Sequence, residues 1–218
     1  MKRAAVILSG CGVFDGAEIH ESVLSLLALD KAGASYQCFA PDVEQAHVVN
    51  HLTGEEMEES RNVLVEAARI ARGKVKPLSE AKVEDFDLVM LPGGFGAAKN
   101  LCNFAFDAEN LEALPELVEF LKSAHGKGLP IGFACIAPAI AARAFGSEGL
   151  AFTIGDDAGT AEALSKWGAA HQDRSVTEIV VDEKLKIVTT PAYMFGEARI
   201  SDVASGLESW VKATLALS

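Results

Sequence analysis

Apolar runs of strand length alternate along this chain with segments in which apolar residues recur at helical spacing. The strand-length runs cover residues 4–8, 36–40, 87–91 and 129–134. Helical periodicity covers residues 19–31, 57–72, 114–125, 160–167 and, near the end of the chain, about 197–215. A short strand near Phe152 and a hairpin formed by residues 178–181 and 187–190 complete the pattern.

This alternation predicts an α/β fold, in which a doubly wound, mainly parallel sheet is covered by helices on both faces. The length of 218 residues fits a single domain over residues 1–218, and half of the residues are hydrophobic, which is enough for a large core. Ligands of such sheets bind beyond the carboxyl ends of the strands. We therefore expect the functional site in the loops that follow the strands.

Cys135 stands where the apolar run 129–134 changes abruptly into an alanine-rich segment that predicts a helix. A strand, a sharp turn and a helix form a nucleophile elbow, in which the turn lifts the side chain clear of the sheet. The helix start offers free N–H groups and a positive dipole end, so we expect the Cys135 thiol to be more acidic and more reactive than a buried one. The alternative is a cysteine that fills a core site as a small apolar residue.

A glycine-rich loop follows the run at 87–91, with Gly93, Gly94 and Gly96 among residues 92–100. Three glycines in four positions let the backbone turn tightly and direct N–H groups toward a ligand. The spacing differs from the dinucleotide and phosphate-loop signatures, so we interpret the segment as an oxyanion-binding loop. A plain glycine-rich turn is the alternative.

The net charge of −12 limits the classes of binding partner that we expect. Nucleic acids and anionic membranes both attract clustered Lys and Arg, so we expect neither as a partner and favour a small, neutral or weakly charged substrate. The four cysteines, Cys11, Cys38, Cys102 and Cys135, contain no CxxC pair, which argues against a zinc site and against a disulfide framework. We therefore expect a reducing, cytoplasmic location, with an organellar one as the alternative for a processed chain.

The histidines give weak signals of metal binding. His47 and His51 have the i,i+4 spacing of a helical metal site, but the glutamate of the HExxH motif is missing between them. We therefore predict no metal and no cofactor.

Several blocks of the chain resemble one superfamily. Residues 91–94 (LPGG) and 134–138 (ACIAP) resemble the class I glutamine-amidotransferase-like superfamily, which contains the PfpI peptidases and the parkinsonism-associated deglycase. Blocks that further resemble the ElbB family, described as glyoxalase-like and linked to isoprenoid biosynthesis, are residues 7–13, 15–21, 92–100, 135–138 and 188–192. The resemblance implies a flavodoxin-like fold and a homodimer.

The resemblance also implies a catalytic partner for Cys135. In the superfamily a glutamate on the helix after the first strand contacts the nucleophilic cysteine, and counting back from the helix end at Gly33 places it at Glu21, with Glu18 as the second choice. A partly desolvated carboxyl group with a raised pKa can hold a proton beside a thiolate and pass it to a substrate. Alternatively, each carboxylate only stabilises the start of a helix.

At two positions this sequence departs from the catalytic residues of the superfamily, and both departures reduce the range of activities that we expect. The glutaminases pair their cysteine with a downstream His-x-Glu, whereas His171 is followed at that spacing by Asp173. Ile136 stands where peptidases and the stronger glyoxalases commonly carry histidine. Unless His20, another histidine or a partner subunit supplies that group through space, the remaining dyad suits an aldehyde better than an amide.

We therefore expect a weak, cofactor-independent glyoxalase that converts glyoxal or methylglyoxal to hydroxy acids. Cys135 would form a hemithioacetal, whose oxyanion the backbone N–H groups of Gly94 and Ile136 would hold. Glu21 would move a proton between the two carbons. The alternatives are a redox-sensing or partner-binding role and a deglycase activity. Secondary site candidates are Glu18, His20, Gly93, Asn100 and Cys11, the last as a thiol that could resolve an oxidised Cys135.

Overall fold

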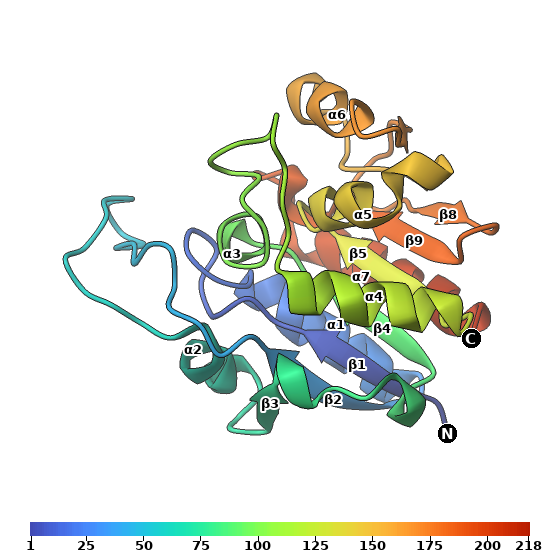
Figure 1. The fold of residues 1–218 in the computed structure, drawn as a ribbon, viewed down its shortest axis with the longest axis horizontal. Coiled ribbons are helices and arrows are strands. Elements are labelled where there is room, and N and C mark those ends of the chain that lie inside the picture. Colours follow the sequence, from blue (N-terminus) through green and yellow to red (C-terminus); the bar gives the residue numbers. More distant parts are fainter.

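The computed structural model describes residues 1–218 and contains a seven-stranded sheet with the order β3-β2-β1-β4-β5-β9-β8 (Figure 1). Six neighbouring strands run parallel, and β8 at the edge runs antiparallel to β9. The strands are β1 (Arg3–Ile7), β2 (Ser35–Ala40), β3 (Val75–Pro77), β4 (Leu88–Leu91), β5 (Ile131–Ala134), β8 (Val180–Asp182) and β9 (Ile187–Thr190). The predicted doubly wound, mainly parallel sheet is confirmed.

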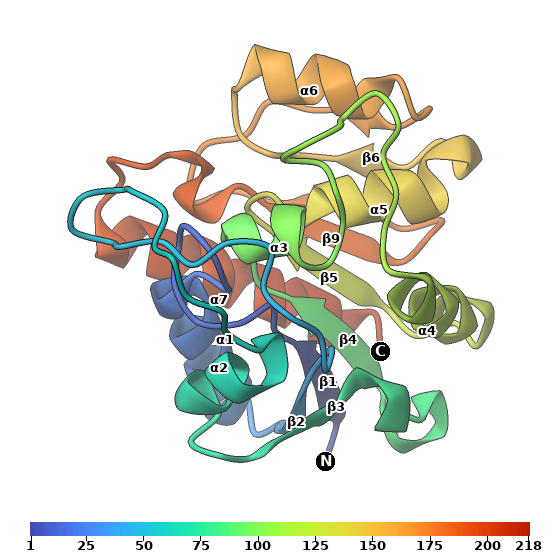
Figure 2. The ribbon, with the colours of Figure 1, turned by 60° about the vertical axis from the view of Figure 1, so that its left-hand side comes forward.

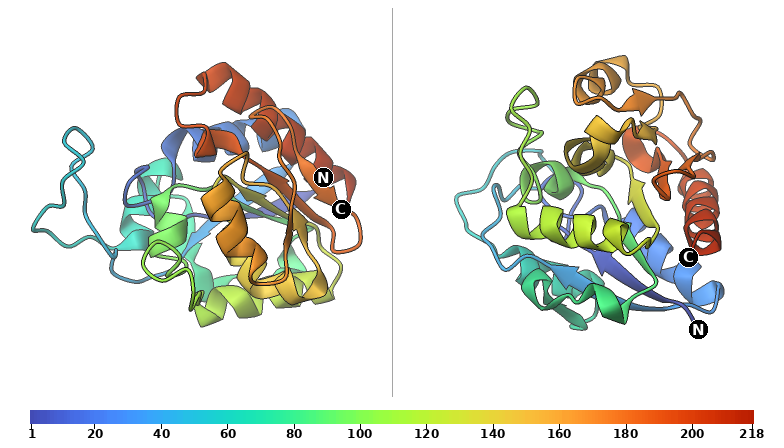
Figure 3. Two further views of the ribbon diagram at one scale, coloured as in Figure 1. Left: turned by 90° about the horizontal axis from the view of Figure 1, so that it is seen from above. Right: turned by 45° about the vertical axis from the view of Figure 1, so that its right-hand side comes forward.

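Helices cover both faces of the sheet, which forms the middle of three layers (Figure 3). One face packs against α1, α2 and α7, and the other against α4 and α5. The helices are α1 (Ile19–Lys31), α2 (Val63–Ile70), α3 (Phe95–Lys99), α4 (Pro115–Gly126), α5 (Pro138–Phe145), α6 (Ala158–Ser165) and α7 (Ile200–Ala216). Single 3-10 turns cover Leu78–Glu80, Val83–Asp85, Gly146–Glu148 and Ala192–Met194.

The central strands explain why the sequence shows continuous apolar runs. Every residue of β4, β5 and β9 is buried, because helices cover the sheet on both sides. None of the helices combines the length and the hydropathy of a membrane-crossing segment.

The predicted helix over residues 57–72 is wrong in its first half. α2 begins only at Val63, directly after Asn62. The side-chain oxygen of Asn62 accepts a hydrogen bond from the N–H of Val65 at 3.0 Å, which stabilises this residue as the start of the helix. Asn62 therefore acts as a helix cap and not as an interior helical residue.

Residues 41–62 form an irregular excursion that leaves the body of the molecule (Figures 1 and 2). An isolated β-bridge between Glu44 and Asn62 closes its base. The acidic run at residues 55–59 has no apolar face to bury, so packing gives a helix there no stabilisation. The helical spacing of His47 and His51 has no structural counterpart, since both lie in this excursion.

The other predicted elements are present, with ends shifted by no more than three residues. The hairpin is the pair β8–β9. The short strand near Phe152 is β6 (Ala151–Phe152), which pairs with β7 (Ala170–His171) in a separate two-stranded sheet. The edge strand β3 was not predicted, because its Lys76 and Pro77 break the apolar pattern.

Gly132 in β5 packs against the ring of Trp210 in α7. A Cβ atom at Gly132 would lie 2.8 Å from three atoms of this buried ring, whose Nε1 donates to the carbonyl oxygen of Val188 at 3.0 Å. Overpacking against a fixed ring costs about 1–3 kcal/mol. We expect Gly132→Ala to lower the free energy of unfolding, measured in urea, by that amount.

Gly126→Ala is the matched control for this packing prediction. A Cβ atom at Gly126 would meet no atom within 4 Å. Since alanine also restricts the unfolded chain, this variant should match or slightly exceed the parent in stability. If both variants unfolded at the same urea concentration as the parent, the packing argument would be wrong.

Candidate active site

Cys135 occupies the sharp turn between β5 and α5. Its backbone φ is +58°, a left-handed conformation that is rare for a residue with a side chain. The N–H of Cys135 donates to the carbonyl oxygen of Thr190 at 2.9 Å, which fixes the turn to the neighbouring strand β9. The geometry matches the elbow that the sequence predicts, although the side chain is only 6% exposed.

Gly93 and Gly94 allow the loop after β4 to approach the cysteine. A Cβ atom on Gly93 would lie 2.5 Å from the Cβ of Cys135 and 3.0 Å from Oε2 of Glu21. Gly94 has a φ of +93°, and a Cβ atom there would lie 2.3 Å from the backbone nitrogen of Glu18. The loop is therefore more than a flexible turn, because any side chain at these positions would displace the site.

Glu21 in the first turn of α1 is fully buried beside Cys135. Its Oε2 accepts from the N–H of Gly93 at 2.8 Å, and its Oε1 accepts from the N–H of Tyr193 at 3.1 Å. The Cys135 side chain is its neighbour, because Cβ of Cys135 and Oε2 of Glu21 both lie against Gly93. Burial, and then the nearby charge of Glu18, raise the pKa of Glu21 to about 7, although these hydrogen bonds oppose the shift.

Glu18 differs from Glu21 in both its position and its role. It caps α1, because its carboxylate accepts from the backbone N–H of Glu21 at 2.6 Å. Burial raises the pKa of Glu18 as well, while the hydrogen bond from the Glu21 N–H lowers it. The helix-start explanation thus accounts for Glu18, whereas Glu21 makes its contacts to the loops around the cysteine.

The thiol of Cys135 is not made acidic by its position. Burial raises its pKa well above the usual value, and the negative charge of Glu21 raises it further, while the N–H groups of Gly94 and Ile136 oppose both effects. The prediction of a more acidic thiol at the helix start is therefore wrong. Because the charge of Glu21 disfavours the thiolate further, the ionisations of the two side chains are coupled.

Tyr193 is a site residue that the sequence analysis missed. Its backbone N–H holds Glu21, and its hydroxyl oxygen lies 3.1 Å from Nδ1 of His20. His20 itself is exposed and contacts the site through this hydroxyl group. The sequence contained one signal for this residue, because the block at residues 188–192, which resembles the ElbB family, ends directly before Tyr193.

A cavity of about 300 Å³ opens beside Cys135. Glu18, Gly94, Thr160 and Tyr193 contribute polar atoms to its wall. Most of the lining is apolar and includes Val13, Phe95, Phe104, Ile136 and Met194. No histidine lines the cavity, so the residue that Ile136 replaces is not supplied from elsewhere in the chain.

Asn100 is a structural residue and does not reach the cavity. Its Nδ2 donates to the carbonyl oxygens of Ser9 and Asp15, both at 2.9 Å. Its Oδ1 accepts from the N–H of Ala46 at 2.9 Å. The side chain therefore connects the loop after β1 with α3 and with the base of the excursion. Its assignment as a secondary site candidate is corrected to a structural role.

Cys11 is also separate from the cavity. It is half-buried in the loop after β1, with Glu66, Arg69 and Asp15 as the nearest charged groups. Burial, followed by the charge of Glu66, raises the pKa of its thiol. Its place beyond the carboxyl end of β1 was predicted correctly, but it does not line the space in front of Cys135.

The remaining histidines of the sequence analysis make local contacts. His47 packs edge-on against Phe106, and Nε2 of His51 accepts from the N–H of Phe14 at 3.2 Å. His171 accepts from the N–H of Ile154 at 3.3 Å, beside the small sheet. No group of three or more His, Cys, Asp or Glu side chains is arranged to hold a metal ion.

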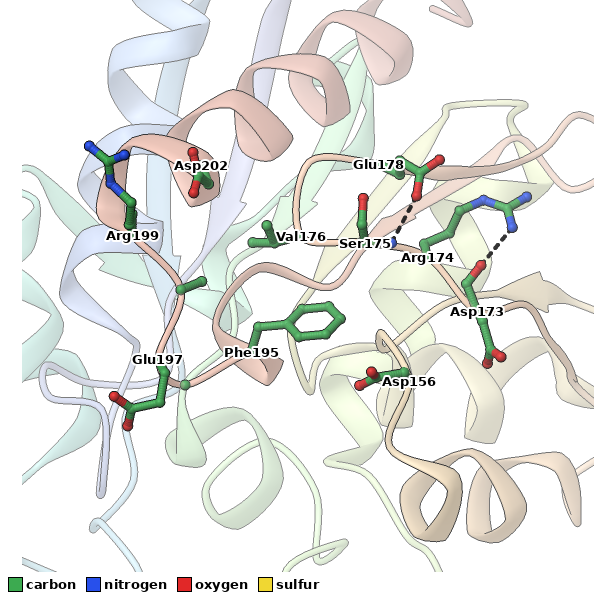
Figure 4. A pocket seen from close by; sticks show the side chains of 12 residues that line it. Asp156, Asp173, Arg174, Ser175, Val176, Glu178, Phe195, Glu197, Arg199 and Asp202 are labelled. Carbon is green, nitrogen blue, oxygen red and sulfur yellow. Dashed lines mark hydrogen bonds between the residues drawn. The ribbon is translucent and has the colours of Figure 1, made fainter.

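A larger cleft of about 830 Å³ lies beside the start of α7 (Figure 4). It is rich in charged side chains, but several of these form hydrogen bonds with other residues of the cleft wall. The N–H of Ser175 donates to Glu178 at 2.9 Å, and Arg174 donates to the carbonyl oxygen of Asp173 at 2.7 Å. None of the predicted site residues lines this cleft, so the Cys135 cavity is the candidate active site.

The chain is similar to known proteins over nearly its whole length. Residues 5–196 match the DJ-1/PfpI family. The chain is 46% identical to the mitochondrial ES1 protein homolog of Rattus norvegicus, over 99% of this chain and 84% of that protein. It is 45% identical to the mitochondrial glutamine amidotransferase-like class 1 domain-containing protein 3 of Homo sapiens, over 99% of this chain and 83% of that protein.

Solved structures extend the comparison. A crystal structure of an isoprenoid biosynthesis protein with an amidotransferase-like domain from Ehrlichia chaffeensis is 36% identical, with a TM-score of 0.93 over 100% of this chain and 99% of that chain. Glyoxalase III from Candida albicans has a TM-score of 0.61 at 16% identity, over 98% of this chain and 97% of that chain. The second likeness concerns the fold alone.

The expected cytoplasmic location is contradicted by these comparisons. The rat and human relatives are both named as mitochondrial proteins. The expectation was based on four cysteines that form no disulfide, and this feature does not identify a compartment.

The raised pKa of Glu21 predicts a pH dependence of stability. Between the ordinary value of 4.5 and about 7, the folded state keeps the Glu21 proton that the unfolded state releases. The stabilisation is therefore complete below pH 4.5 and is lost as the pH rises to about 7. At about 1.4 kcal/mol per pH unit, the loss amounts to about 3 kcal/mol.

Urea titrations of the parent and of Glu21→Gln between pH 4.5 and 8 measure this loss, because glutamine does not titrate. We expect the parent to lose about 3 kcal/mol relative to the variant over this interval. Parallel stability curves for the two proteins would mean that Glu21 titrates in the folded protein as it does in the unfolded chain.

Proposed function

The chain belongs to the DJ-1/PfpI family, and we propose that it is a cofactor-independent glyoxalase in which Cys135 attacks the aldehyde carbon of an α-oxoaldehyde. One observation carries the proposal: the fully buried Glu21 carboxyl group accepts from the N–H of Gly93, the same residue that packs against Cys135, so the acid and the thiol are neighbours. Burial raises the pKa of Glu21 to about 7. Such a group can take up and return a proton at neutral pH. The pair therefore supplies both a nucleophile and a proton carrier.

In the first step the sulfur of Cys135 forms a bond to the aldehyde carbon. The π electron pair of the carbonyl group moves to its oxygen, and the thiol proton passes through Glu21 to that oxygen, which gives a hemithioacetal. The N–H groups of Gly94 and Ile136, which face the sulfur, are placed to donate to the developing oxyanion.

In the second step Glu21 removes the proton from the former aldehyde carbon and returns it to the neighbouring carbon, while the hydroxyl proton of the hemithioacetal passes to the oxygen of the neighbouring carbonyl group. The first carbon is oxidised to a thioester and the second is reduced to an alcohol, so no external oxidant or reductant is needed. Water then cleaves the bond between carbon and sulfur. The 2-hydroxy acid leaves, and the thiol of Cys135 is restored.

The absence of a histidine from the cavity wall supports an aldehyde substrate over an amide. Amide hydrolysis expels an amine that must be protonated as it leaves, and histidine is the usual acid for this step. Addition to an aldehyde expels nothing. The fold likeness to glyoxalase III of Candida albicans is compatible with this choice.

Within the family we assign the chain to the ElbB branch, with a link to isoprenoid metabolism. The support is the block pattern of the sequence, together with the 36% identity to the Ehrlichia chaffeensis protein that is described as an isoprenoid biosynthesis protein.

The alternatives fit the site less well. A redox sensor needs a thiol that oxidises readily, whereas Cys135 is buried with a raised pKa and Cys11 lies outside the cavity. A deglycase would begin from the same hemithioacetal, but the enclosed position of Cys135 favours a free aldehyde over an adduct carried on a protein.

Replacing the nucleophile should abolish the activity. We expect Cys135→Ala to reduce the conversion of glyoxal and methylglyoxal to the uncatalysed rate, with an unchanged circular dichroism spectrum, since alanine fits the same turn. Cys11→Ala is the control and should keep the parent rate, because this cysteine does not line the cavity. Turnover by Cys135→Ala at the parent rate would remove the basis of the proposal.

The two glutamates should differ in their effect on turnover. Glu21→Gln removes the proton carrier and should lower kcat by about 10² or more. Glu18→Gln keeps an oxygen that can cap α1, so its effect should be far smaller. Steady-state kinetics with methylglyoxal would decide between them, and the opposite ranking would assign the proton transfer to Glu18.

A further inference from the structure

The cavity beside Cys135 is large for the smallest α-oxoaldehydes. Its volume of about 300 Å³ is at the lower end of the range of about 300–1,000 Å³ that encloses drug-sized ligands. Glyoxal and methylglyoxal are much smaller than such ligands. A substrate of their size would leave much of the apolar wall in contact with water.

The wall of the cavity is built from apolar side chains of several separate segments. Val13 comes from the loop after β1, Phe95 from α3, and Ile136 from the elbow itself. Phe104 belongs to the loop between α3 and α4, which reaches α6 (Figures 1 and 2), where Nε1 of Trp167 donates to the carbonyl oxygen of Ala108 at 3.4 Å. These segments enclose the space around the sulfur with hydrocarbon.

The charges around the cavity exclude an anionic substrate. Glu18 is its one charged lining residue, and no Lys or Arg contributes to the wall. Lys99, the nearest candidate in α3, donates to the carbonyl oxygen of Phe14 at 3.0 Å and lies over the ring of Phe95. A carboxylate or phosphate on the substrate would therefore find no counter-ion and would face Glu18.

We infer that the preferred substrates are uncharged α-oxoaldehydes with an apolar chain of several carbons, whose carbonyl end lies at Cys135 and whose chain fills the cavity toward Phe104 and Ile136. The chemistry rests on the proposed function, and the inference adds the substrate class. Ile136 has a direct role, because a hydrocarbon side chain next to the nucleophile replaces the histidine common in the superfamily and lengthens the apolar wall.

The first experiment compares straight-chain 2-oxoaldehydes from methylglyoxal to 2-oxooctanal. Each buried methylene contributes about 0.8 kcal/mol, which corresponds to about a fourfold gain in kcat/KM. We expect this gain for each added carbon until the cavity is full, with KM falling and kcat nearly constant. A flat or falling kcat/KM along the series would overturn the inference.

The second experiment tests the wall with two variants of one loop. Phe104→Ala removes a ring that lines the cavity and should lower the selectivity for 2-oxohexanal over methylglyoxal about tenfold. Phe106→Ala is the matched control, because this ring lies two residues away, is 54% exposed and does not line the cavity. The control should keep the parent selectivity, and equal effects of the two variants would contradict the placement of the chain.

The third experiment separates the substrate class from the chemistry. Cys135 is alkylated with iodoacetamide at alkaline pH, where a thiol with a raised pKa ionises, while unreactive ketones from 2-butanone to 2-octanone compete for the cavity without turnover. Peptide mass analysis of Cys135 should show that the ketone concentration for half-protection falls about fourfold per methylene.

The outcomes of the three experiments are distinct. Length-dependent protection without turnover of any aldehyde would refute the proposed glyoxalase and leave the apolar site intact. Turnover that is fastest with glyoxal, together with protection that does not depend on chain length, would refute the substrate class and leave the glyoxalase intact.

Discussion

The burial of the Glu21 carboxyl group beside Cys135 is the constraint on which the rest of the site depends. A carboxyl group removed from water needs hydrogen-bond donors, and two backbone N–H groups from distant loops supply them, those of Gly93 and Tyr193. One side chain thereby connects α1 with the loop after β4 and with the turn after β9. The same burial that raises the pKa of Glu21 to about 7 also raises the pKa of the Cys135 thiol, so both groups are held in their protonated forms to higher pH than in water.

The parallel sheet makes this convergence possible. Strands β1, β4, β5 and β9 are neighbours and end at the same edge, so the loops that follow them meet although they are far apart in the sequence. The approach is close enough to require glycine at position 93, where a Cβ atom would collide with the Cβ of Cys135. The positive φ of Cys135 marks the sharp turn that brings this residue against Gly93 and beside Glu21.

The surroundings of this dyad decide which chemistry suits it. No histidine and no cationic side chain lines the cavity, and Ile136 presents a hydrocarbon surface next to the sulfur. A buried thiol with a raised pKa is poorly suited to free oxidation. In the proposed reaction it adds to an aldehyde that enters the cavity, and the apolar wall contributes binding energy from the part of the substrate that does not react.

The sequence by itself determined the alternation of the main strands and helices, the turn at Cys135, the glycine loop and the helix after the first strand, which carries Glu21, but not the edge strand β3. These features depend on local patterns, namely apolar periodicity, glycine spacing and an abrupt change after a buried strand. The sequence ranked Glu21 above Glu18 through the family resemblance, but only the tertiary structure showed that Glu18 caps α1 while Glu21 contacts the loops around Cys135. It also showed that Asn100 is a structural residue and that Tyr193 lies at the site, since these depend on partners more than fifty residues away. Two predictions were wrong for the same physical reason: the helix over residues 57–62 and the acidic thiol of Cys135. A local sequence pattern does not show what a segment packs against or how deeply a side chain is buried.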